Sequence, residues 1–378
     1  MPTDTTLDFG TIIGRVRQLE PDIRARADEI DELRRLPGDL VAQLREAGVF
    51  RLAMPAEWGG PDLTPAQQTE IVEEVSRIDA SVGWCVMIGM DSGIFARYLE
   101  PAVARRLFPR LDMITAGWLP PAGLAREVDG GYLVDGHWRF GSGCTHADLI
   151  VGGCTVHAAE SWRVIVAQPS DFTIVDTWHT TGLAGSGSRD YTASNLFVPR
   201  EHTFSFDQPI HPGPLTRQRE AINRKMPGVP LGAARAALDY VHQVAARRTE
   251  RPGGMRWAHS PRVWRAIGSC EMRLSAARSF VYSSLADQWA ELTEGREPSP
   301  RVRAAVALAR YHAFREARDV VGELYDLIGG EAVYSARTPL DRIHRDLITA
   351  CQHVVAQSRT LEHAGELLLG GQPDYAFI

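Results

Sequence analysis

The chain has 378 residues, of which 44% are hydrophobic and 23% are charged, and its formal net charge is −6 at pH 7. This length is more than one core usually spans and the composition is typical of a folded protein, so we expect several packed units. No domain-sized basic face is available for nucleic acid, and neither a secretory leader nor a long apolar segment is visible, which predicts a cytoplasmic protein. The five cysteines are scattered and support neither a disulfide framework nor a structural metal.

Residues 1–112 are predicted to form an α-helical domain. Between residues 7 and 48, apolar side chains recur at helical intervals among charged ones, with a break near each of two prolines. Thr64 followed by Pro65 is typical of a helix N-terminus, because threonine caps the free N–H groups and proline fits the first helical position. The stretch Ser81–Tyr98 is nearly all small or apolar, which predicts a buried helix.

Residues 113–212 are predicted to form a β domain, either a small barrel or two stacked sheets. Short runs rich in Val, Ile, Thr and aromatic residues alternate there with turn signals. Asp129-Gly130 and Asp135-Gly136 are both typical of hairpin turns. Trp138, Phe140 and Ser142 alternate along one predicted strand and should share one face. An ordinary strand with inward aromatic residues and a terminal serine is the alternative interpretation of this pattern.

Residues 213–378 are predicted to form a four-helix bundle, because they contain four long segments with helical periodicity. These segments cover residues 231–248, 260–292, 301–328 and 340–369. The last segment opens with Leu340–Gln357, whose residues sort onto an apolar and a polar stripe. The polar stripe contains Arg342, Asp346, Thr349 and His353. From the pattern alone, His353 also fits a core histidine bonded to a nearby carbonyl.

The order helical, β, helical resembles the acyl-CoA dehydrogenase superfamily, and local motifs along most of the chain support the resemblance. Within the superfamily, the chain most resembles the two-component (group D) flavin-dependent monooxygenases, whose G-x-W-x-x-x-S-G pattern stands here as Gly136–Gly143. The other matching motifs are Gly59-Gly60, Gly182–Ser188, Leu327–Gly330, and Arg345-Asp346 followed by His353.

One position separates the dehydrogenases from the oxygenases. Many acyl-CoA dehydrogenases carry a catalytic glutamate eight residues after the Asp of the Arg-Asp pair, and that position is Val354 here. A valine cannot accept a proton, so this base is not available at position 354, although some family members place it elsewhere. The preceding residue is His353, where the similar oxygenases carry histidine. The resemblance therefore implies that His353 is catalytic, by hydrogen-bonding or deprotonating the substrate.

The resemblance also implies a cofactor site. Ser142 would bond the N5 edge of a flavin, and the Gly- and Ser-rich turn would bind phosphate or pyrophosphate oxygens. Gly329-Gly330 and Arg342 are expected to come from a neighbouring subunit of a homotetramer. The full set of implied cofactor-binding residues is Trp138, Phe140, Ser142, Gly143, Gly185, Ser186, Ser188, Gly329, Gly330 and Arg342.

The chain lacks a nicotinamide-binding motif, since the turn at Gly185–Ser188 has no third glycine and no strand-turn-helix context. The expected partner is therefore a separate flavin reductase that supplies reduced FMN or FAD. With O₂ as cosubstrate, the implied activity is oxygenation of a small organic molecule, such as an aromatic compound or a natural product, through a C4a-hydroperoxyflavin. The alternatives are an acyl-CoA dehydrogenase with a relocated base and a non-catalytic flavin-binding protein.

Overall fold

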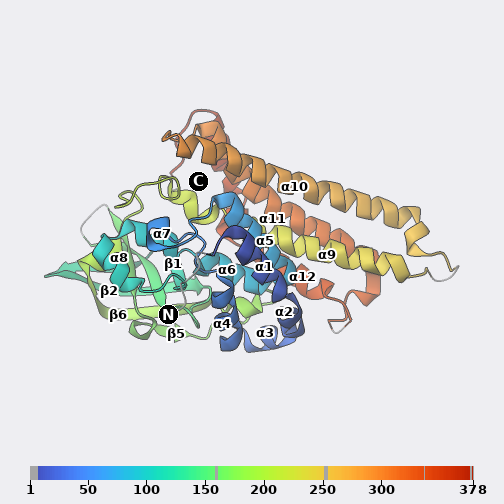
Figure 1. The fold of residues 1–378 in the computed structure, drawn as a ribbon, viewed down its shortest axis with the longest axis horizontal. Helices are drawn as coiled ribbons and strands as arrows, with labels where there is room; N and C mark the ends of the chain where they lie inside the picture. Colours follow the sequence, from blue (N-terminus) through green and yellow to red (C-terminus); the bar gives the residue numbers. More distant parts are fainter. Residues whose placement is uncertain (1–6, 158–160, 251–253, 336, 375–376, 378) are drawn as a thin grey trace. The chain divides into compact units, whose positions relative to one another are not determined.

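The computed structural model of the chain describes residues 7–157, 161–250, 254–335, 337–374 and 377 (Figure 1). The chain divides into two compact units. Unit 1 comprises Met1–Ile71, Trp84–His179 and Ala184–Ile222, and unit 2 comprises Val72–Gly83, Thr180–Leu183 and Asn223–Ile378. The domain boundaries expected after residues 112 and 212 remain predictions.

The N-terminal part of unit 1 is helical, as expected. The helix α5 begins where the sequence predicts it, because Thr64 and Gln67 form a reciprocal cap: the Gln67 N–H donates to Thr64 Oγ1 and the Thr64 N–H donates to Gln67 Oε1. The described α-helices up to the sheet are α1 (Phe9–Gln18), α2 (Glu20–Ala25), α3 (Ala27–Leu33), α4 (Gly38–Ala47), α5 (Pro65–Ile78), α6 (Ala80–Gly89), α7 (Ser92–Phe95) and α8 (Pro101–Leu107).

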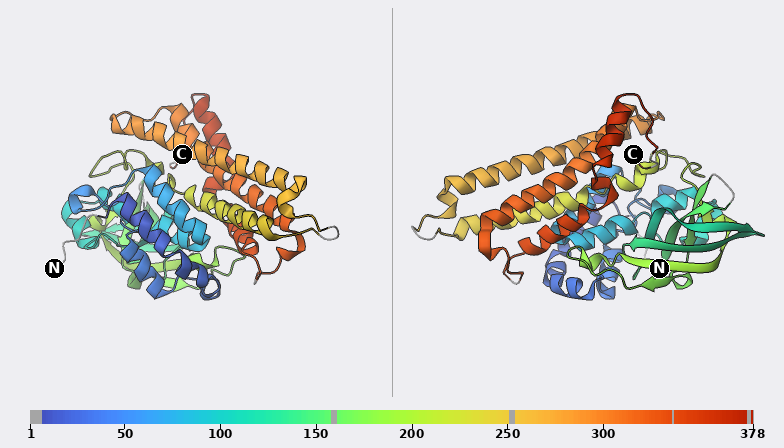
Figure 2. Two further views of the ribbon diagram at one scale, coloured as in Figure 1. Left: turned by 45° about the vertical axis from the view of Figure 1, so that its right-hand side comes forward. Right: turned by 180° about the vertical axis from the view of Figure 1, so that it is seen from behind.

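The β part of unit 1 is a single seven-stranded sheet in the order β5-β6-β2-β1-β3-β4-β7. The pair β1–β3 is parallel and the other pairs are antiparallel, and the right-hand view of Figure 2 shows the strands as a twisted sheet. The strands are β1 (Thr115–Val128), β2 (Gly131–Gly141), β3 (Leu149–Val156), β4 (Trp162–Ala167), β5 (Thr173–Val175), β6 (Arg189–Pro199) and β7 (Thr203–Phe204).

Only one of the two predicted hairpin turns is present. Asp129 and Gly130 connect β1 to β2, and the positive φ of Gly130 suits the turn. The prediction of a turn at Asp135-Gly136 was wrong, since both residues lie inside β2 and pair with β1. Gly136 is required there by packing, because a Cβ at this position would lie 2.4 Å from the ring of Trp138.

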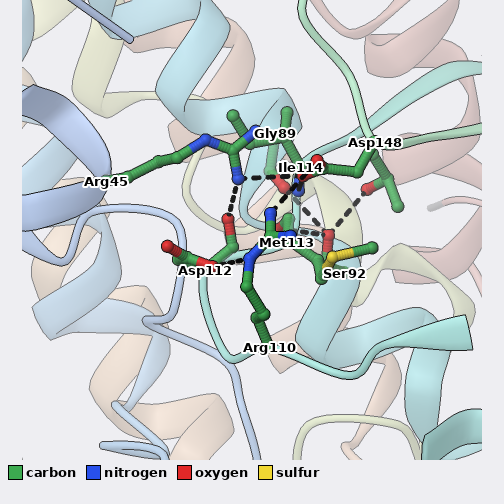
Figure 3. Close-up of polar contacts among 9 residues, drawn as sticks. Arg45, Gly89, Ser92, Arg110, Asp112, Met113, Ile114 and Asp148 are labelled. Atoms are coloured by element: carbon green, nitrogen blue, oxygen red, sulfur yellow. Dashed lines mark hydrogen bonds and ion pairs between the residues drawn. The ribbon is translucent and has the colours of Figure 1, made fainter. Parts of the chain in front are cut away.

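A partly buried polar network attaches the helical part of unit 1 to the start of β1 (Figure 3). Arg45 of α4 forms an ion pair of 2.9 Å with Asp148. Asp148 accepts the N–H of Ile114 at 2.8 Å, just before β1. The Ser92 hydroxyl of α7 donates to the carbonyl of Met113 at 2.7 Å. These contacts fix the position of α4 and α7 relative to the start of β1, the central strand of the sheet.

Unit 2 contains a bundle of long helices, with α9, α10 and α11 lying side by side (Figure 1). The helix α11 is the centre of the bundle, since it packs against each of the other four. No helix among the described residues combines the length and the apolar character needed to cross a membrane. The bounds are α9 (Gly228–Arg247), α10 (Pro261–Thr293), α11 (Pro300–Ile328), α12 (Leu340–Ala350) and α13 (Arg359–Leu368).

The fourth predicted helix is broken, which corrects the prediction of one continuous segment. Helix α12 ends at Ala350 and α13 begins only at Arg359. Two side-chain bonds hold the intervening turn: Gln357 Nε2 donates to the Cys351 carbonyl at 2.8 Å, and the Cys351 thiol donates to the Phe314 carbonyl of α11 at 3.3 Å. A side chain thus satisfies a carbonyl at the helix end, where neither glycine nor proline marks a stop.

Candidate functional site

Three serines and a tryptophan form a buried hydrogen-bonded chain in unit 1. The Trp84 indole N–H donates to Ser142 Oγ at 3.0 Å. Ser142 Oγ lies 2.7 Å from Ser188 Oγ, which lies 2.7 Å from Ser186 Oγ. All four residues are at most 6% exposed. The predicted site residues Ser142, Ser186 and Ser188 are therefore brought together, although they come from two separate motifs.

Trp84 was missed by the sequence analysis. It lies in a helix whose residues are almost all small or apolar, and an indole N–H buried in such a helix needs an acceptor elsewhere. That requirement is visible in the sequence, but the identity of the acceptor is not, because Ser142 is far away along the chain.

The turn that carries Ser186 and Ser188 is fixed by backbone bonds. The Gly143 N–H donates to the Ser186 carbonyl at 2.9 Å, and the Cys144 thiol donates to the Gly187 carbonyl at 3.7 Å. Burial raises the pKa of Cys144 to about 11, which keeps the thiol protonated and unsuited to nucleophilic attack near neutral pH. Gly185 is also buried in this turn. The serines are consequently held in place by the loop that follows β2.

The prediction that Trp138, Phe140 and Ser142 share one face is wrong. The pairing of β2 with β6 shifts register between Trp138 and Gly141, and Phe140 has a φ of +58°. This irregularity turns the Phe140 side chain outward, where it is 51% exposed. Ser142 lies beyond the end of the strand. Strand alternation therefore fails within the motif itself.

Trp138 belongs to the interior of the sheet. It is fully buried, its ring stacks on Tyr191 at a centroid distance of 5.3 Å, and its Nε1 donates to the Gly153 carbonyl at 2.8 Å. A Cβ on Gly123 would lie 2.5 Å from the same ring. The tryptophan of the motif thus packs in the interior of the sheet and stabilises β2. The proposed contact between Trp138 and a cofactor remains a prediction.

Two aromatic side chains lie beside the outward-turned Phe140. Its ring centroid lies 5.7 Å from that of Trp118 and 6.2 Å from that of Trp178. Trp118 and Trp178 are half-buried. This aromatic group, defined by Trp118, Phe140 and Trp178, provides apolar ring faces in the same unit as the serine chain.

In unit 2, His353 lies in the turn after α12, so the polar stripe predicted to include it ends at Thr349. Its φ and ψ are −62° and 145°, an extended conformation. The Val355 N–H donates to His353 Nδ1 at 3.4 Å. Burial is the larger cause and the positive charge of Arg310 the smaller one, and together they lower the pKa of His353 to about 4. The imidazole is neutral at pH 7, and the bond to Nδ1 places its proton on Nε2.

Arg345 and Asp346 of the family motif hold the turn Thr180–Leu183. Asp346 is 3% exposed and accepts the Leu183 N–H at 2.6 Å. Arg345 donates to the Thr181 carbonyl. A Cβ on Gly182 would lie 2.1 Å from the Arg345 carbonyl oxygen, so only glycine allows this approach. The pair is structural here.

Gly329 and Gly330 line a groove of about 1320 Å³ in unit 2. Four arginines line the same groove, Arg247, Arg248, Arg262 and Arg337, and so do three acidic residues, Glu250, Asp326 and Glu331. Arg342 does not line it. The sequence analysis missed these arginines, because they come from three separate segments. Two of them form ion pairs within the groove, Arg248 with Glu331 at 3.5 Å and Arg262 with Glu250 at 3.6 Å. No cluster of three potential metal ligands occurs among the residues that the structure describes.

Comparisons with known proteins identify the family of the chain. The family model described as acyl-CoA dehydrogenase, C-terminal domain, matches residues 227–358, and the model described as acyl-CoA dehydrogenase, N-terminal domain, matches residues 15–111. Together the two models cover more than half of the chain.

Two curated relatives are similar over nearly their full length. Indole-3-acetate monooxygenase from Pseudomonas putida is 29% identical over 359 residues, covering 93% of this chain and 91% of that protein. The flavin-dependent monooxygenase, oxygenase subunit HsaA, from Rhodococcus jostii is 27% identical over 380 residues, covering 96% of this chain and 95% of that protein.

Solved structures share the fold. The 3-HSA hydroxylase from Rhodococcus sp. RHA1 superposes with a TM-score of 0.91 at 24% identity, covering 97% of this chain and 99% of the other. XiaF from Streptomyces sp., solved in complex with FADH2 and glycerol, superposes with a TM-score of 0.89 at 22% identity and covers 97% of each chain.

Proposed function

Because this chain belongs to the acyl-CoA dehydrogenase superfamily and is a flavin-dependent monooxygenase, we propose that it hydroxylates a small aromatic molecule as the oxygenase component of a two-component system. The relatives are named for indole-3-acetate and, more generally, for flavin-dependent oxygenation. The single observation that carries the proposal is the buried hydrogen-bonded chain of Ser186, Ser188 and Ser142, because Ser142 is the serine of the G-x-W-x-x-x-S-G motif.

The residues of unit 1 fit a flavin. The serine chain offers hydroxyl groups that can bond the polar edge of an isoalloxazine, and the aromatic group offers ring faces against which it can pack. We propose that Phe140, Ser142 and Gly143 contact the ring, while Gly185, Ser186 and Ser188 support it or its phosphate. When bound, reduced flavin reacts with O₂ and supplies the oxygen atom that reaches the substrate.

His353 is proposed to serve the substrate. A neutral imidazole that keeps its proton on Nε2 donates a hydrogen bond, which would orient a phenol or another polar ring substituent. Deprotonation of that substituent by Nε2 would first require the imidazole to change tautomer and release the Val355 N–H. We therefore propose that the main role of His353 is to orient the substrate. We expect its contribution to the rate to be of the size usual for general acid–base groups.

Two features support a separate reductase as partner. The described sheet is mainly antiparallel, and its one parallel pair, β1–β3, is connected through β2 instead of a helix. A dinucleotide-binding βαβ unit would need the helical connection. We propose that reduced FMN or FAD arrives from another protein, and that nicotinamide oxidation takes place there.

A homotetramer is proposed for the assembly. Large apolar side chains remain exposed along α10, at Trp264 (56%), Met272 (66%) and Phe280 (36%). Burying such side chains against another copy is favourable. Arginines of the groove around Gly329 and Gly330 would then bind the anionic part of a flavin held by a second copy, with Arg342 as a further candidate.

The proposal is tested by incubating the purified chain with a flavin reductase, NADH, FMN or FAD, and a panel of phenols and indoles under ¹⁸O₂. Incorporation of one ¹⁸O atom into a product, only with the reductase present, supports it. Reduction of the oxidised flavin by an acyl-CoA, without oxygen incorporation, would instead identify a dehydrogenase.

A further inference from the structure

The serine chain has a property that the family assignment does not contain, namely that its hydrogen bonds can point in two directions. An indole N–H is only a donor, so Trp84 always occupies one lone pair of Ser142 Oγ. A hydroxyl has one proton and two lone pairs, which leaves Ser142 one lone pair and one proton. The bond between Ser142 and Ser188 uses one of these two.

In the first arrangement, Ser188 donates to Ser142 and accepts from Ser186. The Ser142 proton is then available to a third group, and Ser142 acts as a hydrogen-bond donor. In the second arrangement, Ser142 donates to Ser188 and Ser188 donates to Ser186. The remaining lone pair of Ser142 is then available, and Ser142 acts as an acceptor. The two 2.7 Å contacts permit both arrangements, because only hydroxyl rotors change.

The two arrangements match the two redox states of a flavin. Oxidised isoalloxazine has a lone pair at N5, whereas reduced isoalloxazine carries an N–H there. Resting on the proposed function, we infer that Ser142, Ser188 and Ser186 form a reversible hydroxyl chain through which Ser142 donates to N5 of oxidised flavin and accepts from N5–H of reduced flavin. Trp84 is a positioning residue that anchors Ser142 in both states.

Burial makes the direction of the chain matter for affinity. Ser186 and Ser188 are 1% and 3% exposed, so water cannot replace a lost partner. Without the Ser188 hydroxyl, Ser142 can still donate to N5 of oxidised flavin. When reduced flavin is bound, however, Ser142 accepts a hydrogen bond from N5–H. Its own hydroxyl proton then has no acceptor, because the Ser188 hydroxyl has been removed. An unsatisfied buried donor is costly, so Ser188→Ala should weaken binding of reduced flavin selectively.

The test measures dissociation constants of FMN and FAD in both redox states, anaerobically for the reduced forms, by flavin and tryptophan fluorescence. We expect Ser188→Ala to weaken the binding of reduced flavin roughly 5- to 150-fold more than the binding of oxidised flavin. This range follows from the loss of one buried hydrogen bond. Trp84→Phe should weaken both states about equally, because the Trp84 bond is the same in both arrangements. This second variant keeps the inference testable if Ser188→Ala folds poorly.

Ser92→Ala is the matched control, because Ser92 is also a fully buried serine of unit 1 whose hydroxyl bonds a carbonyl (Figure 3). It should leave the ratio of the two dissociation constants unchanged. Equal weakening of both states by Ser188→Ala, or a selective effect of Trp84→Phe, would overturn the hydroxyl chain while leaving the monooxygenase intact. Absence of flavin binding by the unaltered protein would overturn both.

Discussion

Replacing His353 by glutamine should make the protein less sensitive to acid. The pKa of His353 is lowered from its ordinary value of 6.5 to about 4, first by burial and second by the charge of Arg310. A histidine with a lowered pKa binds fewer protons in the folded than in the unfolded state. Its contribution to stability is therefore present above pH 6.5 and is lost as the pH falls towards 4.

The size of this effect follows from the two pKa values. Between pH 7.5 and pH 5, a complete shift corresponds to a loss of about 2 kcal/mol in the free energy of unfolding, and we expect about 1–2 kcal/mol because His353 as a whole residue is only half-buried. His146, whose pKa is also lowered to about 4 by burial, adds a similar loss that remains in the variant.

The assay is urea unfolding at both pH values. We expect the stability of His353→Gln to fall about 1–2 kcal/mol less than that of the unaltered protein, and His259→Gln, which replaces an exposed histidine, to behave as the unaltered protein does. An identical loss of stability in His353→Gln and in the unaltered protein would refute the claim that the pKa of His353 is lowered in the folded protein.

The remaining predictions concern turnover, packing and assembly. His353→Ala should slow oxygen transfer to substrate about 10²–10⁴-fold without changing flavin affinity, as measured by single-turnover product formation and flavin titration. Ser142→Ala should lower stability by about 1–3 kcal/mol, because the buried Trp84 N–H loses its acceptor, and should raise peroxide release per NADH consumed. Gly136→Ala should cost at least about 1–3 kcal/mol in thermal unfolding, since its Cβ meets an indole that cannot move. Met272→Lys should shift the assembly towards smaller species in sedimentation velocity.

Much of the fold could be predicted because local signals and the tertiary structure agree. The pair Thr64-Pro65 marks the start of α5, and Gly130 marks the first hairpin, since both carry their own capping or turn chemistry. The helical periods of α9, α10 and α11 match the observed bounds within a few residues. The fold class is confirmed by the comparisons.

The failures occurred where distant residues determine the backbone. Phe140 adopts a positive φ within a pairing irregularity, and nothing in its neighbours along the sequence indicates this. Gly136 looks like a turn residue but serves the ring of Trp138. The end of α12 depends on Gln357 and on a carbonyl of α11. Periodicity along the sequence does not show which distant residues these positions contact. The prediction that Trp138, Phe140 and Ser142 share one face and the prediction of a continuous last helix were therefore both wrong.

The candidate site was predicted in part, because a motif names residues without their contacts. Ser142, Ser186 and Ser188 were chosen from two motifs and lie within hydrogen-bond distance in one unit. Trp84 was absent from that choice, although it donates to Ser142. The roles of Gly329, Gly330, Arg342 and His353 remain predictions.

The central claim, that this chain transfers oxygen from O₂ with reduced flavin supplied by another protein, is tested most directly by photochemically reduced flavin. Anaerobic mixing of the chain with prereduced FMN or FAD, followed by ¹⁸O₂ and the aromatic substrate found in the panel, removes the need for a reductase. We predict one ¹⁸O atom per product molecule and no more than one product per reduced flavin. Reoxidation of the bound flavin with stoichiometric peroxide and no labelled product would contradict the account.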